Sequence, residues 1–167
     1  MRYDVAIVGG GPAGSSCARA LTRGGAKVVV LDRAAFPRDK VCAGWITPPV
    51  LRALDIDPAA YASAGLTIEP IRGFRTGTWK RRTLDTAYDE VVSYAIRRCE
   101  FDNYLLGRSG AELRTNTELR TFERTSTGWR VNDDIDALQL RTWHGAQVEG
   151  DAMPRDICYS EPYPSAW

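Results

Sequence analysis

The segment Tyr3–Gly14, with the sequence YDVAIVGGGPAG, runs from an apolar strand straight into a glycine-rich turn. Gly9 permits a tight turn off the strand, and Gly11 lets the backbone approach a pyrophosphate without a Cβ in the way. Gly14 lets the following helix pack closely on the sheet. That helix directs its free N–H groups and the positive end of its dipole at the phosphates. The spacing therefore predicts a dinucleotide-binding turn.

The residues that follow complete a βαβ unit. A helix is predicted over Ser15–Arg23, where small and apolar side chains share one face, and Gly24-Gly25 ends it. The β-branched run Lys27–Leu31 predicts a strand buried in a parallel sheet, and Asp32 follows it. An acid at this point can accept hydrogen bonds from a ribose hydroxyl and repels a 2′-phosphate, which favours NAD or FAD over NADP. On the alternative interpretation, the glycines only shape a βα turn and Asp32 only caps a strand.

The composition excludes several function classes. The 167 residues carry 22 basic and 21 acidic side chains, so no global charge recruits nucleic acid or an anionic membrane, and the basic cluster Lys80–Arg82 has to be judged by its position. No apolar run is long enough to cross a bilayer, and the N-terminal strand is too short for a signal peptide, so we expect a cytoplasmic protein. The four cysteines form no CxxC pair and His144 is the only histidine, so no metal site is expected.

Turn-forming residues dominate the segment after the βαβ unit. Arg33–Val50 predicts a loop. Within it, Thr47 followed by Pro48 predicts the N-cap and the first turn of a short helix, because proline is favoured at that position. Pro58 is expected to interrupt this helix, and Tyr61–Gly65 is expected to form a connector.

The rest of the chain predicts mainly short strands. They are expected over Ile68–Thr76, near Thr78–Thr83, over Val91–Ile96, over Ala111–Leu113 as a return to the nucleotide sheet, over Leu119–Glu123 and Trp129–Val131 as a hairpin, and over Asp133–Leu140. A helix is expected from Arg97 to Leu106, because Phe101 and Leu105 share one face, and Gly110 ends it.

Two later motifs add to the glycine unit and Asp32-Arg33. One is the loop Phe36–Gly44, FPRDKVCAG, and the other is Ile96–Asp102, IRRCEFD, which is followed by Leu105. With these motifs, residues 3–132 resemble the flavoproteins of the para-hydroxybenzoate hydroxylase type, and within them the geranylgeranyl reductase-like group. The resemblance implies an α/β fold, a Rossmann-like FAD-binding βαβ unit with an inserted, mainly antiparallel β segment, which is incomplete in this chain.

The same resemblance implies FAD as the cofactor. Its pyrophosphate would lie on the Gly9–Gly14 turn and its AMP ribose on Asp32, with Arg33 along the adenine side. One of Arg97 or Arg98 would reach the phosphate or ribityl region of the flavin. The full set of cofactor-binding residues implied in this way is Gly9, Gly11, Pro12, Ala13, Gly14, Asp32, Arg33, Cys42, Arg97, Arg98 and Leu119.

Two of these assignments have simpler alternatives. The pair Arg97-Arg98 can also be a solvated helix start. The resemblance places the loop of Cys42 near the flavin. On the simpler interpretation, Cys42 is a small, semi-buried packing residue that takes no part in covalent or acid chemistry. Ala43 stands where the reductases more often have a second glycine, and its methyl group would limit close backbone approach. No catalytic residue is identified.

The domain prediction has three parts. Residues 1–140 form a partial FAD-binding domain, the start of a substrate-domain insertion lies at about 66–96, and residues 141–167 are irregular. The resemblance implies a longer chain in which a second glycine-rich strand returns to the nucleotide sheet and a Gly-Asp segment binds the ribityl chain. Neither is recognisable, and Gly150-Asp151 matches the second only in letters. We interpret the chain as C-terminally truncated with an out-of-frame tail.

The activity implied by the resemblance is reduction of an isoprenoid carbon–carbon double bond, with NAD(P)H as the reductant and FAD as the carrier. An isoprenoid or other apolar small molecule would lie against the strands of residues 68–94, beside Trp79, Tyr88 and Tyr94, and a lipid substrate is compatible with peripheral membrane contact. One alternative is a flavin-dependent monooxygenase or halogenase-like enzyme. The alternative from another class is a non-catalytic, truncated nucleotide-binding remnant.

Overall fold

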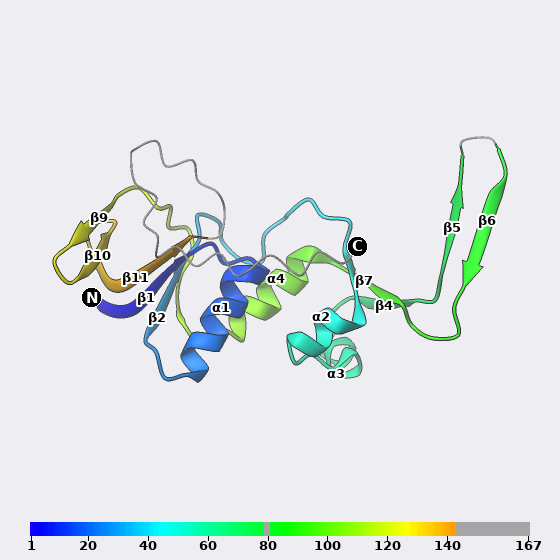
Figure 1. The fold of residues 1–167 in the computed structure, drawn as a ribbon, viewed down its shortest axis with the longest axis horizontal. Helices are drawn as coiled ribbons and strands as arrows, with labels where there is room; N and C mark the ends of the chain where they lie inside the picture. Colours follow the sequence, from blue (N-terminus) through cyan, green and yellow to red (C-terminus); the bar gives the residue numbers. More distant parts are fainter. Residues whose placement is uncertain (79–80, 143–167) are drawn as a thin grey trace. The chain divides into compact units, whose positions relative to one another are not determined.

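The computed structural model describes residues 1–78 and 81–142 (Figure 1). The chain divides into two compact units, of which the first comprises Met1–Phe36 and the residues from Leu105 onward, and the second comprises Pro37–Tyr104. The predicted residues Trp79, His144 and Gly150-Asp151 lie outside the described residues. None of the helices in the described ranges is long and apolar enough to span a bilayer.

The first unit is built on a mixed six-stranded sheet with the order β8-β2-β1-β11-β10-β9. Its strands are β1 (Arg2–Val8), β2 (Val28–Leu31), β8 (Glu112–Arg114), β9 (Phe122–Thr125), β10 (Gly128–Val131) and β11 (Ile135–Thr142). The first four in spatial order are parallel, whereas β11, β10 and β9 form an antiparallel meander. The predicted α/β fold is confirmed.

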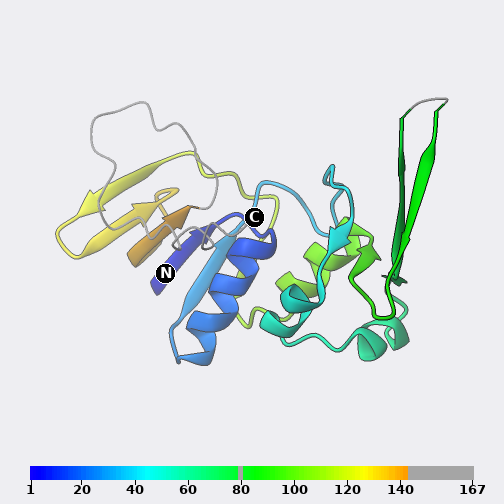
Figure 2. The ribbon, with the colours of Figure 1, turned by 45° about the vertical axis from the view of Figure 1, so that its right-hand side comes forward.

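Both faces of the central strands are buried, as the β-branched sequence requires. Val5, Ile7 and Val30 pack with Ala18 of helix α1 (Pro12–Arg23). Figure 2 shows this helix lying along β1 and β2. The opposite face buries Tyr3, Ala6, Val29, Leu31, Val131, Ile135 and Ala137. Each large side chain removed from water in this way contributes about 1.5–3 kcal/mol, so the two apolar faces hold the first unit together.

β11 makes one pairing that the sequence did not predict. It lies beside β1 in parallel, with Tyr3 opposite Ala137 and Val8 opposite Thr142. It also pairs with β10 as the predicted hairpin strand. Local patterning predicted only the hairpin, because the pairing with β1 joins segments about 130 residues apart and leaves no local signal. β11 extends two residues into the segment that was expected to be irregular.

The second unit contains an antiparallel sheet with the order β3-β7-β4 and a separate hairpin of β5 and β6. Its strands are β3 (Trp45–Ile46), β4 (Ile68–Ile71), β5 (Gly73–Gly77), β6 (Thr83–Ala87) and β7 (Ser93–Ile96), and its helices are α2 (Pro48–Ala53) and α3 (Pro58–Ser63). Helix α4 (Arg98–Gly107) follows β7. The buried apolar side chains of the second unit are Leu51, Ile56, Tyr61, Ile96 and Phe101.

Three local predictions for the second unit are wrong. Pro58 begins α3 instead of leading into a connector, because the Asp57 side chain accepts a hydrogen bond from the Ala59 N–H and proline suits the first helical position. The strand expected near Thr78–Thr83 starts only at Thr83. β3 lies inside the predicted loop and pairs with β7.

Candidate functional site

The glycine turn lies between β1 and α1 in the first unit. Gly9 has φ +106°, a conformation that favours glycine, and its N–H donates to the Leu31 carbonyl at 2.8 Å. A Cβ on Gly14 would lie 1.8 Å from the Gly9 carbonyl oxygen. The turn and the start of the helix therefore touch backbone to backbone, as predicted for these two glycines.

The N-terminus of α1 is free of competing side chains. Gly11 is its N-cap and makes no side-chain hydrogen bond, Pro12 is the first helical residue, and the first turn holds no acidic residue. Anions are stabilised at such a terminus by the helix dipole and the unpaired backbone N–H groups. The geometry of this end of the helix fits a phosphate, and Ala13 presents only a methyl group there.

Asp32 ties the end of β2 to the glycine turn. It is 9% exposed, and its Oδ2 accepts a hydrogen bond from the Gly10 N–H at 2.7 Å. Its Oδ1 accepts one from the Ala34 N–H at 2.9 Å. A carboxylate at the end of this strand is the group that accepts hydrogen bonds from a ribose hydroxyl in dinucleotide-binding turns. The acid predicted as a ribose acceptor thus also fixes the shape of the turn, a role that the sequence analysis missed.

A third segment of the first unit lies beside this acid. The Thr117 N–H donates to the Asp32 carbonyl at 2.9 Å, and the Asn116 N–H donates to the Ala34 carbonyl at 3.3 Å. The predicted contact residue Leu119 follows two residues after Thr117 and packs half-buried against the sheet core. Arg33, the predicted adenine neighbour, is exposed. The first unit therefore brings the glycine turn, Asp32 and the segment before Leu119 together.

The other predicted residues belong to the second unit, where the two arginines differ sharply. The Arg97 side chain is 65% exposed and donates to Glu100 at 3.0 Å. The Arg98 side chain is 24% exposed, and its Nε donates to Oδ1 of Asp102 at 2.5 Å. The simpler interpretation of a solvated helix start therefore fits Arg97 and does not fit Arg98.

Asp102 is a functional-site candidate that the sequence analysis did not single out. Its carboxylate is fully buried, and its Oδ2 lies 3.5 Å from Nη2 of Arg38 without a hydrogen bond. Two guanidinium groups thus converge on one carboxylate. The spacing of four residues between Arg98 and Asp102 on a helix is the signal that could have revealed the pair.

Cys42 lies next to Arg98 and is exposed. A hydrogen bond from the Gly44 N–H, at 3.4 Å to the Sγ, and a further one from Arg98 lower the pKa of the Cys42 thiol. Exposure and a lowered pKa make a thiol more reactive towards electrophiles. The semi-buried packing residue of the simpler interpretation does not match this environment. We name Arg38, Cys42, Arg98 and Asp102 the arginine–thiol cluster.

No group of three His, Cys, Asp or Glu side chains within residues 1–78 and 81–142 could hold a metal ion. The model of the family described as FAD dependent oxidoreductase matches residues 4–103, which include the glycine turn, Asp32 and the arginine–thiol cluster. The chain belongs to this FAD-dependent oxidoreductase family.

Two curated relatives of this flavoenzyme family show how much of such a protein the chain represents. It is 51% identical over 178 residues to a menaquinone reductase of Mycolicibacterium smegmatis, covering 91% of this chain and 43% of that protein. It is 37% identical over 129 residues to a geranylgeranyl diphosphate reductase of Rhodobacter capsulatus, covering 75% of this chain and 31% of that protein. The chain therefore spans less than half of the length of each relative.

Two solved structures share the FAD-dependent oxidoreductase fold. A geranylgeranyl bacteriochlorophyll reductase-like protein from Thermoplasma acidophilum has a TM-score of 0.70 and 21% identity, covering 88% of this chain and 40% of that one. The halogenase PltM in complex with phloroglucinol and FAD has a TM-score of 0.65 and 21% identity, covering 84% of this chain and 34% of that one. At these identities the likeness establishes the fold alone.

Proposed function

We propose that the chain binds the nucleotide part of FAD on the glycine turn and belongs to a reductase of isoprenoid carbon–carbon double bonds. The observation that carries the first part is the buried carboxylate of Asp32, which lies at the glycine turn through its bond to the Gly10 N–H, at the end of β2. Gly9, Gly11 and Gly14 supply the turn, and the uncapped N-terminus of α1 would hold the pyrophosphate.

The proposed substrate class rests on the relatives and on the second unit. The two relatives are named for reduction of menaquinone and of geranylgeranyl diphosphate, both of which carry isoprenoid chains. FAD, when bound, would pass reducing equivalents from NAD(P)H to the double bond. On this chain, Trp45, Phe74 and Tyr88 form an aromatic cluster, with ring centroids 5.2 Å apart for Trp45 and Phe74 and 6.2 Å apart for Phe74 and Tyr88. We propose that this cluster contacts the apolar chain, because Trp45 and Tyr88 are exposed.

In the second unit, Arg98 is the better of the two candidates for cofactor contact. Asp102 fixes its guanidinium and leaves other N–H donors available, whereas Arg97 lies exposed beside Glu100. We assign Arg98 to a phosphate or ribityl oxygen and give Arg97 no cofactor role. For Cys42 we propose proximity to the flavin, and we assign it no step in the chemistry.

Flavin titration tests the nucleotide site directly. The purified chain should quench the fluorescence of added FAD, and Asp32→Ala should weaken binding about tenfold or more, since a hydrogen bond to a charged group contributes about 1.5–3 kcal/mol. Asp57→Ala is the matched control, because it removes another acid that accepts backbone hydrogen bonds, at the start of α3. Equal affinity of the wild type and both variants would contradict the proposed role of Asp32. No binding at all would contradict the proposal as a whole and favour a non-catalytic remnant.

Reduction of the bound flavin tests the proposed reduction of isoprenoid carbon–carbon double bonds. NADPH or NADH should bleach the flavin absorbance without oxygen, and an added isoprenoid alkene should restore it. The fold is shared with a halogenase, which makes a monooxygenase or halogenase-like enzyme the second candidate. Rapid restoration by oxygen in the presence of substrate, with hydroxylated or halogenated product, would favour that candidate.

A further inference from the structure

The hairpin of β5 and β6 extends from the second unit as a narrow two-stranded ribbon (Figures 1 and 2). Five residue pairs join its strands, from Gly73 opposite Ala87 to Gly77 opposite Thr83. Most of its residues beyond Phe74 are exposed. An isolated two-stranded ribbon is only marginally stable in water, so the exposed part contributes little to the core and is a candidate for an interaction surface.

The two faces of this ribbon differ in charge. Arg75 and Asp85 lie opposite each other on one face, where Nε and Nη2 of the arginine donate to the two carboxylate oxygens at 2.6 and 2.8 Å. This bidentate pair neutralises its own face. Thr76 and Leu84 are the adjacent pair in the register, so strand alternation places them on the other face. Leu84 is 67% exposed there.

The tip of the ribbon carries positive charge that the neighbouring sequence does not balance. Arg81 and Arg82 are both exposed, and the sequence from Gly77 to Leu84 contains no acidic residue. In the described part of the chain, neither arginine forms an ion pair with a carboxylate. The chain as a whole is nearly neutral, with a formal charge of +1. The tip is therefore a local basic patch on a protein without a general attraction to anions.

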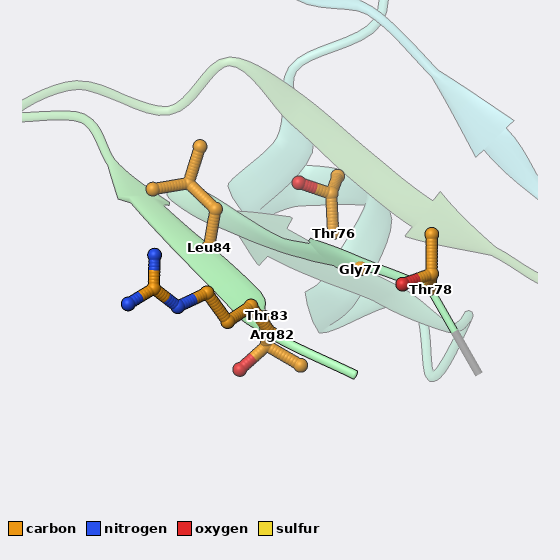
Figure 3. A pocket seen from close by; sticks show the side chains of 6 residues that line it. All are labelled: Thr76, Gly77, Thr78, Arg82, Thr83 and Leu84. Atoms are coloured by element: carbon orange, nitrogen blue, oxygen red, sulfur yellow. The ribbon is translucent and has the colours of Figure 1, made fainter. Parts of the chain in front are cut away.

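An open hollow of about 570 Å³ lies beside this patch, lined by Thr76, Gly77, Thr78, Arg82, Thr83 and Leu84. Figure 3 shows the side chains of Thr76, Thr78 and Leu84 on one side of the ribbon, with Arg82 extending from the start of β6. Hydroxyl and guanidinium groups donate hydrogen bonds to phosphate oxygens, and an exposed leucine suits hydrocarbon. The hollow thus combines the two chemistries of a phospholipid at a membrane surface.

We propose that the tip of the β5–β6 hairpin docks on the surface of an anionic phospholipid membrane. Arg81 and Arg82 face the headgroup phosphates, and Leu84 enters the boundary between the headgroups and the acyl chains. This inference goes beyond the proposed function. It needs no bound flavin, and its test reads membrane binding alone, so the failure of one proposal is distinguishable from the failure of the other.

Vesicle co-sedimentation tests the proposal on the full chain. Binding is compared between vesicles of phosphatidylcholine and vesicles that contain one third phosphatidylglycerol. We expect binding to the anionic vesicles only, weakening as sodium chloride is raised. Because each cation near an anionic surface is worth about a fivefold change in partitioning, Arg81→Glu with Arg82→Glu should reduce binding by about 25-fold or more. Leu84→Ser should reduce it by a smaller factor.

The matched control is Arg52→Glu with Arg120→Glu, which changes the net charge equally at exposed positions that are not part of the hairpin. Binding of this variant should fall much less than that of the hairpin variant. An equal fall in both, retained binding after the hairpin substitutions, or equal binding to neutral vesicles would overturn the proposal. So would displacement by inorganic phosphate but not by chloride of the same ionic strength, because that outcome indicates a free-phosphate site. Displacement by RNA at constant ionic strength would indicate a nucleic-acid surface instead.

Discussion

Each unit of the chain buries one acid at its candidate site, and the two acids are held in different ways. In the first unit, Asp32 accepts hydrogen bonds from backbone N–H groups, which are fixed by the glycine turn and by the chain after β2. In the second unit, Asp102 is held by the side chains of Arg98 and Arg38. A backbone-held acid depends on the path of the main chain, whereas a side-chain-held acid depends on its charged partners. Substitutions should therefore damage the two units through different residues.

The largest effect is expected in the second unit. Asp102→Ala removes the carboxylate shared by two partly buried guanidinium groups and should lower the free energy of unfolding by about 3–5 kcal/mol, because an uncompensated charge is left in a buried place. Urea unfolding followed by circular dichroism measures this. Asp85→Ala breaks the exposed pair on the hairpin and serves as the control, with a much smaller change expected. Equal, small changes in the free energy of unfolding of both variants would contradict this prediction, because burial would then not increase the contribution of Asp102 to stability.

The corresponding substitution in the first unit adds a Cβ atom where two backbone segments are in contact. In Gly14→Ala, the new Cβ meets the Gly9 carbonyl, so the turn has to open, at a cost of about 3 kcal/mol and with loss of FAD binding. Gly107→Ala is the control, because a Cβ there meets nothing within 4 Å and α4 should gain up to about 1 kcal/mol in stability. Thermal unfolding and FAD titration measure both variants. A Gly14→Ala protein that unfolds and binds FAD like the wild type would contradict the close contact.

A smaller effect is expected for the pKa of Cys42, and it tests whether Arg98 contacts the thiol. Alkylation of Cys42 by iodoacetamide should rise with pH at a midpoint below the usual value of about 8.5 for a free thiol, because the Gly44 N–H and the Arg98 guanidinium lower its pKa. Arg98→Gln should move this midpoint upward. Peptide mapping by mass spectrometry separates Cys42 from the other cysteines, and Arg97→Gln is the control. An unchanged midpoint in Arg98→Gln would remove Arg98 from the environment of the thiol.

The smallest effect concerns a polar group without a hydrogen bond. The Tyr61 hydroxyl is buried and has no partner in the described structure, while its ring packs edge-on against Tyr104 at 4.8 Å. Tyr61→Phe should therefore change stability near neutral pH by no more than about 1 kcal/mol, with either no change or a gain. Ala60→Gly, on the same helix, is a control that should destabilise by a similar amount through helix propensity.

Burial raises the pKa of Tyr61, which adds a pH dependence. The phenol is neutral in the folded protein and ionises more readily when unfolded, so its contribution is complete below about pH 10 and is lost as pH rises above that value. Urea unfolding at pH 8 and at pH 11 should show a steeper loss for the wild type than for Tyr61→Phe. Parallel losses would contradict the burial of the hydroxyl.

The sequence predicted the βαβ unit because its signals are local. The glycine spacing, the apolar face of α1 and the β-branched strand all lie within residues 3–32, and each is confirmed by the fold. The start of α3 was missed although Asp57-Pro58 is the same kind of N-cap and first-turn pair as Thr47-Pro48. There the proline was interpreted only as a helix breaker, and not as a helix start.

The remaining features of the fold and the candidate site could not be predicted from local sequence patterns. The parallel pairing of β11 with β1 joins segments that are far apart in the chain, and the bond from the Gly10 N–H to Asp32 depends on how the turn folds against the end of β2. Likewise, the sequence could not separate Arg97 from Arg98, because both are basic residues at the start of one helix. The choice depends on which of them faces Asp102, and thus on the phase of the helix.

The place of β11 in the sheet has a consequence for synthesis on the ribosome. β1 leaves the exit tunnel before its two neighbours in the sheet, β2 and β11, and β11 is made last among the described elements. The Met1 amine donates to the Asp134 carbonyl at 2.9 Å, directly before β11. Until residues 135–142 emerge, the edge of β1 is unpaired and open to other nascent strands. The waiting time is set by translation, so slow codons before β11 should increase aggregation of the newly made chain.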